Sequence, residues 1–109
     1  MTAGPNRSSE GPITVQINED LKEIVPGFLG NRRRDVQTLE LALGQDDLHA
    51  IHMIGHRLKG DGGGYGFDAI SVIGGILEQA AAREDRNEIR RQIAELGDFL
   101  ARVTVVYQK

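Results

Sequence analysis

One short segment, residues 49–63, concentrates the side chains that could do chemistry, because it holds all three histidines of the chain. At about 100° per residue, the turn angle of an α-helix, His49, His52, His56 and Lys59 fall on one side, within roughly 60° of His56. The opposite side is apolar and should face a core. His56 would then be an exposed imidazole, able to act as a nucleophile when neutral, beside an ammonium group.

Glycines follow the histidines along the same segment. Gly60 and Gly63 fall on or near the histidine side, where a glycine costs about 1 kcal/mol of helix stability relative to alanine. Such a cost suggests that a partner must come close to His56. Gly62 and Gly64 are expected to permit close helix packing and helix termination. The run forms no nucleotide-binding loop, because it has no G-x-G-x-x-G pattern and its lysine precedes the glycines.

The histidine spacing also leaves a metal-binding alternative open. His52 and His56 are four residues apart on one helix, a spacing that can chelate Zn²⁺ or Ni²⁺, and His49 could be a third ligand. No further ligand is evident, so we predict no resident metal site.

The motif around His56 resembles the signature of histidine-containing phosphotransfer (HPt) domains. The sequence Gly55-His56-Arg57-Leu58-Lys59-Gly60 matches small-His-x-Leu-Lys-Gly. Gly66 and the later pair Leu77-Glu78 match the glycine and the Leu-Glu pair of the same signature. The resemblance extends over about residues 13–106, including Phe28-Leu29 and the run Arg32-Arg33-Arg34-Asp35 upstream.

The resemblance implies a histidine phosphocarrier of a two-component phosphorelay. His56 would accept a phosphoryl group from a receiver phosphoaspartate or a histidine kinase and pass it to a response-regulator receiver. Lys59 would offset the negative charge of that group. The docking surface would comprise exposed residues near His56, namely His52, Met53, Gly60 and Gly63.

The same resemblance implies a phosphotransfer intermediate rather than an enzyme. It would have no cofactor of its own, because the partner receiver supplies the catalytic aspartate and Mg²⁺. A helical module that binds receivers without becoming phosphorylated is one alternative, and a metal-binding bundle that uses the histidines is another.

Length and composition agree with one small helical domain. The 109 residues are 39% hydrophobic and 27% charged, with a net charge of −3, which gives no electrostatic case for nucleic acid. The chain contains no cysteine and no apolar run long enough to span a membrane. We therefore expect a cytoplasmic monomer.

Helical spacing predicts an all-α fold, an antiparallel up-down-up-down four-helix bundle with a short N-terminal helical lead-in, over residues 13–109. Residues 1–12 should form a flexible tail, and residues 13–17 an extended arm without a strand partner. Asn18, Asp46 and Asp85 are the expected N-caps. The last helix should include Val103 and Tyr107, which continue its apolar spacing.

Pro26 should either kink the first helix or separate a short helix from a longer one, and that longer helix should end at Gly44. The histidine helix should end between Asp61 and Gly64, and the next should begin near Phe67. Arg32, Arg33 and Arg34 should form a solvated basic patch, with docking of an acidic partner as the alternative.

Overall fold

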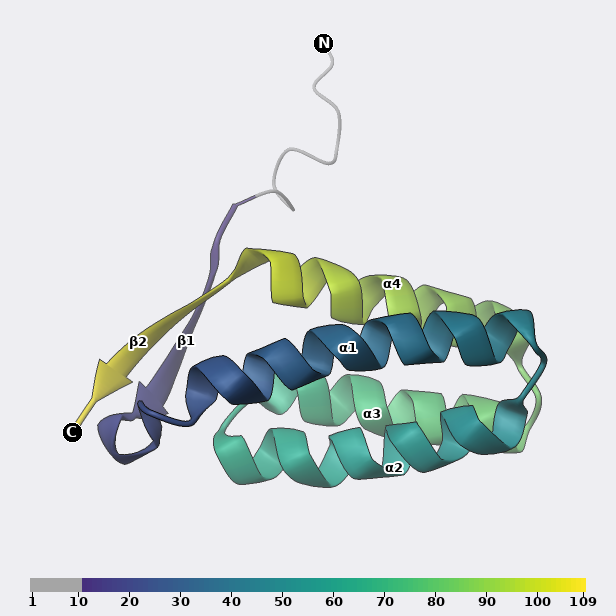
Figure 1. Cartoon of the computed structure of the whole chain (residues 1–109), viewed down its shortest axis with the longest axis horizontal. Coiled ribbons are helices and arrows are strands. Elements are labelled where there is room, and N and C mark those ends of the chain that lie inside the picture. Colours follow the sequence, from purple (N-terminus) through teal and green to yellow (C-terminus); the bar gives the residue numbers. More distant parts are fainter. Residues whose placement is uncertain (1–10) are drawn as a thin grey trace, which may run out of the picture.

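The computed structural model describes residues 11–109, and its main body is a bundle of four helices (Figure 1). They are α1 (Val25–Gly44), α2 (Leu48–Tyr65), α3 (Asp68–Ala82) and α4 (Arg86–Arg102). Each helix packs against the next, and α4 also packs against α1. The α1–α2 and α3–α4 connections lie at one end of the bundle and the α2–α3 connection at the other (Figure 1). The chain is therefore mostly helical, as predicted. The expected tail falls almost wholly outside the described residues.

The core forms where the apolar sides of the four helices meet. Its fully buried side chains come from every helix and include Leu39, Ile51, Leu58, Ile70, Leu77, Ile89 and Leu96. Burying one such side chain stabilises the fold by about 1.5–3 kcal/mol. No helix among residues 11–109 is long and apolar enough to cross a membrane.

Local capping explains where the helices begin. Asp47, not the predicted Asp46, caps α2 by accepting a hydrogen bond from the backbone of Ala50. Asp46 has a positive φ of 57° and belongs to the turn that leaves α1, so it cannot be the cap. Asp85 caps α4 as predicted, accepting from Glu88 N.

The region around Pro26 adopts the second of the two predicted forms. A 3₁₀ turn, η2 (Glu19–Leu21), precedes α1, and Asn18 caps it by accepting from Asp20 N. Pro26 lies in the first turn of α1, where its missing N–H removes no helical hydrogen bond.

The two ends of the described chain form strands, which the sequence analysis did not predict. β1 (Ile13–Asn18) pairs in parallel with β2 (Val103–Gln108), with Ile13 opposite Val103 and Asn18 opposite Gln108. The expectation that Val103 and Tyr107 extend the last helix was therefore wrong. So was the expectation of an unpartnered arm. The predicted short helical lead-in is present as the 3₁₀ turn η2, which follows β1.

The reason for the error is that two periodicities coincide at the end of the chain. Val103 and Tyr107 continue the helical spacing of α4, but Val103, Val105 and Tyr107 also alternate with more exposed residues. β-Branched and aromatic residues favour a strand, and β1 supplies the hydrogen-bonding partner that a strand needs.

Helices α2 and α3 approach so closely that their backbones touch. A Cβ on Gly74 would lie 2.5 Å from Lys59 N and 2.7 Å from Gly55 O. A Cβ on Gly62 would lie 2.5 Å from Ser71 N, so the predicted role of Gly62 in close packing is confirmed. The same contacts help α2 continue to Tyr65, past its predicted end, until Gly66 takes up a φ of 89°.

This packing predicts opposite effects for two glycine substitutions. Gly74→Ala should lower the free energy of unfolding by about 1–3 kcal/mol or more, because backbone atoms cannot move aside without separating the helices. Gly60→Ala should raise it by about 1 kcal/mol, because nothing lies within 4 Å of the added Cβ. Urea denaturation measures both, and equal effects at the two positions would contradict the proposed contact.

Candidate functional site

His56 stands on the outer side of α2, as the helical spacing predicts. Its side chain is 69% exposed, and its Nδ1 lies 2.8 Å from Oε2 of Glu78. One nitrogen of the ring is therefore bound to the protein, while the rest of the ring faces outward.

Glu78 connects the two basic side chains of the site. It projects from α3, its side chain is only 12% exposed, and its second oxygen lies 2.8 Å from Lys59 Nζ. The hydrogen bond from Lys59, and then that from His56, hold the pKa of this carboxyl below its ordinary value. A carboxylate thus remains charged between an imidazole and an ammonium group.

This arrangement fixes which histidine nitrogen is available. An ionised carboxylate only accepts hydrogen bonds, so Nδ1 of His56 must carry the hydrogen in the contact with Glu78. In a neutral ring, the lone pair then lies on Nε2. Nε2 is the nitrogen left free to react.

The other predicted site residues surround His56 on the same helix. His52 is half-buried, and Met53 is 57% exposed although apolar. Gly60 and Gly63 are exposed; a Cβ on Gly60 would have no neighbour within 4 Å, and one on Gly63 would meet only Ser71 Oγ at 3.8 Å. The surface beside His56 therefore has no bulky side chain at these two glycines, and a partner can approach the backbone of α2 there.

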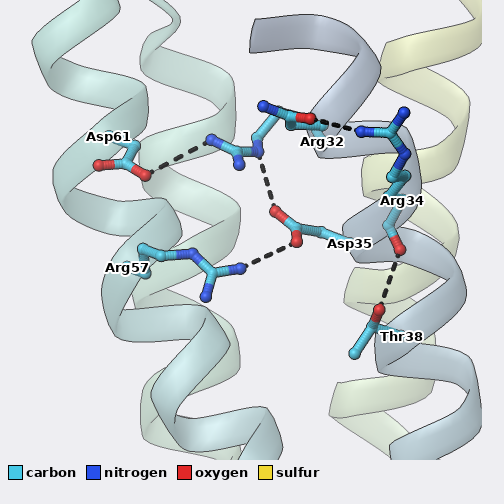
Figure 2. A network of polar contacts seen from close by, with 7 residues as sticks. Arg32, Arg34, Asp35, Thr38, Arg57 and Asp61 are labelled. Carbon is cyan, nitrogen blue, oxygen red and sulfur yellow. Dashed lines mark hydrogen bonds and ion pairs between the residues drawn. The ribbon is translucent and has the colours of Figure 1, made fainter.

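A second polar cluster joins α2 to α1 on the other side of His56. Asp35 accepts from Arg32 and Arg57, at 2.8 and 2.9 Å, and Arg32 also reaches Asp61 at 3.4 Å (Figure 2). Arg32 is buried, with its guanidinium 4.7 Å from the centre of the Phe28 ring.

The prediction of a solvated patch was therefore wrong for Arg32, because partners on two helices bury and neutralise it. The two neighbouring arginines are exposed but also engaged: Arg33 donates to Leu100 O, and Arg34 donates to Asn31 Oδ1.

The metal-binding alternative gains no support from the described part of the chain. Across residues 11–109, no three histidine, aspartate or glutamate side chains lie close enough together to hold a metal ion.

Comparison with protein families identifies the domain. A family model described as the Hpt domain matches residues 23–104, most of the chain. This chain belongs to the Hpt domain family. The family implies a phosphotransfer role in two-component signalling, as a phosphocarrier module that interacts with receivers and kinases. Comparisons with curated proteins and with solved structures gave no match for this Hpt domain.

A chemical role for Glu78 was not predicted from the sequence. The pair Leu77-Glu78 was identified only as part of the family signature. One signal in the sequence was available: Glu78 directly follows Leu77, which is fully buried on α3, so its carboxylate lies at the edge of the core. Which α2 side chain the carboxylate contacts depends on how α2 and α3 pack, and the sequence does not show this.

The lowered pKa of Glu78 predicts how stability depends on pH. Because the folded state holds this proton less tightly than the unfolded state, the carboxylate stabilises the fold above its ordinary pKa. That contribution is lost as the pH falls through the lower, folded-state pKa. The stability difference between the wild type and Glu78→Gln should therefore shrink between about pH 6 and about pH 3.

Urea denaturation across this range measures the difference. Glu95→Gln, which replaces an exposed glutamate on α4 and leaves the His56 site intact, is the matched control for general acid effects. A difference that stays constant with pH would show that Glu78 is not held ionised by its two partners.

Proposed function

We propose that this Hpt domain is a histidine phosphocarrier. His56 would accept a phosphoryl group from a receiver phosphoaspartate or a histidine kinase and pass it to a response-regulator receiver. The observation that carries the proposal is the contact of Nδ1 with Glu78, because it leaves Nε2 as an outward-facing nucleophile on a rigid helix.

The chemical step follows from this geometry. The lone pair of Nε2 attacks phosphorus, an N–P bond forms, and the P–O bond to the donor carboxylate breaks. Nδ1 keeps its hydrogen, so the phosphorylated ring is positively charged. Glu78 stabilises that charge through the hydrogen bond it already makes, and the reverse reaction hands the group to the next aspartate.

Lys59 lies close enough to His56 to interact with the phosphoryl group itself. Its ammonium group contacts Glu78 at rest and is about half exposed, so it can turn toward a phosphoryl group on the adjacent ring. Positioning and charge stabilisation are the main sources of rate in phosphoryl transfer. The role proposed for Lys59 is therefore to offset phosphoryl charge.

The exposed α2 side chains beside His56 suit an acidic partner. They are neutral or basic and include Met53, Arg57 and Lys59, with the half-buried His52 beside them. A receiver site combines carboxylates, bound Mg²⁺ and phosphate. The partner would supply that Mg²⁺ and the aspartate, and this chain would supply the histidine. The cytoplasmic location stays a prediction.

The first test is phosphoryl transfer from a receiver labelled by a small phosphodonor in Mg²⁺. We expect acid-labile, base-stable phosphate on His56 in the wild type and none in His56→Gln. His49→Gln is the matched control, because His49 lies on the same side of α2 but outside the predicted docking surface, and it should still be labelled. Phosphosite mapping by mass spectrometry locates the group.

The alternative of a binding-only module makes the opposite prediction. Such a protein would bind receivers equally well with His56 replaced and would never become labelled. Labelling of His56→Gln, or its absence from a correctly folded wild type with several receivers, would contradict the phosphocarrier proposal.

A second test addresses the positioning role of Glu78. Glu78→Leu should slow transfer to His56 by about tenfold or more, because the ring loses the acceptor that sets its tautomer. Glu78→Gln keeps an acceptor oxygen and should be affected less. ¹⁵N chemical shifts of the His56 ring report the tautomer directly. An unchanged tautomer in Glu78→Leu would show that Glu78 does not select it.

A further inference from the structure

The two-stranded sheet lies at the end of the bundle where α2 and α3 connect (Figure 1). One face carries Ile17, which is buried in the core, and five half-buried residues that pack against the core, namely Ile13, Val15, Val103, Val105 and Tyr107. The strands contact each other much more closely than either contacts any helix. A two-stranded sheet is marginal by itself, and a third strand or a covering helix normally stabilises it.

The outer edge of β2 is bare along the described chain. The sheet has two strands within the described residues, so no strand pairs with the edge of β2 that faces away from β1 (Figure 1). Neither strand contains a charged residue, a proline or a glycine. Proteins that remain monomeric usually protect such edges with charges, prolines or bulges. This edge is open to a further strand.

We propose that β2 pairs along this edge with β2 of a second copy, antiparallel about a twofold axis at Val105. The product is a four-stranded sheet, β1-β2-β2-β1, that joins two bundles. This inference goes beyond the phosphocarrier function and replaces the expectation of a monomer, because the sequence alone did not predict the strand pair.

The register follows from the two faces of β2. Residues directly opposite each other in antiparallel strands lie on the same face of the sheet. Centring the pair on Val105 places Val103 opposite Tyr107 on the apolar face and Thr104 opposite Val106 on the exposed face. Val106 is 45% exposed in the single chain and gains a β-branched cross-strand neighbour.

Charge argues for a second copy as the occupant. In this register, Arg102 faces Gln108 of the second copy, and Lys109 faces Ala101, so no like charges meet. Arg102 is already paired with Asp98. A twofold interface requires a surface complementary to itself, and an uncharged strand with this alternation meets that requirement. β2 continues from α4, whereas His56 lies on α2, so the proposed contact and the phosphotransfer site belong to different elements.

The proposal is tested by measuring the mass in solution of the wild type and of variants that carry like or opposite charges on β2. The wild type should reach a dimer mass, twice 11.9 kDa, by light scattering or sedimentation as its concentration rises into the millimolar range. The variant with Thr104→Lys and Val106→Lys should remain a monomer, because lysines of the two copies face each other. The variant with Thr104→Glu and Val106→Glu should behave likewise, and an equimolar mixture of the two variants should form a heterodimer.

The control and the contrary results are specific to this edge. Thr14→Glu with Gln16→Glu places the same charges on the exposed face of β1, away from the outer edge of β2, and should leave the dimer intact. A wild type that stays monomeric overturns the proposal. So do lysine variants that still dimerise, or lysine and glutamate variants that keep their helical circular dichroism but do not associate when mixed.

A single cysteine tests the register. The chain has no cysteine, so Val105→Cys would introduce the only thiol, and two copies would bring these residues face to face. Residues directly opposite in antiparallel strands have Cα atoms about 4.5–5.5 Å apart, a separation that a disulfide can bridge. Mild oxidation should link Val105→Cys into a dimer much faster than Val103→Cys. Equal rates would contradict an axis at Val105.

Discussion

The backbone contact between α2 and α3 is the constraint on which the rest of the site depends. Gly55 and Gly74 face each other across this contact, and side chains at either position would force the helices apart. A short carboxylate on α3 can therefore reach an imidazole on α2 directly. Without that approach, Glu78 could not contact both His56 and Lys59, and the orientation of the ring would not be fixed.

Helix α2 is held from both sides, which explains how an exposed histidine can still be well positioned. Glu78 binds the α3 side of α2, and the cluster of Arg32, Asp35, Arg57 and Asp61 binds the α1 side. In both places a mostly buried carboxylate, Glu78 or Asp35, binds more exposed basic side chains of α2. The rigid parts of the site lie below the surface, and the reactive nitrogen lies on it.

The strand pair shows the limit of periodicity as a guide. Residues 103–107 fit the helical spacing of α4 and also the alternation of a strand, and local sequence does not choose between them. The choice depends on β1, which lies at the other end of the described chain. A similar limit applies to Arg32, whose burial depends on an aspartate on its own helix and another on α2.

Residue types and spacing alone were enough to predict the helical class, the position of His56 on an outer helix face and the resemblance that the family comparison confirmed. These features follow from local spacing and residue type. Only the tertiary structure decided that Glu78 holds Nδ1 of His56, that Arg32 is buried and that residues 103–108 form a strand. Each of these depends on contacts between residues far apart in the sequence, and such contacts are fixed only when the helices and strands pack together.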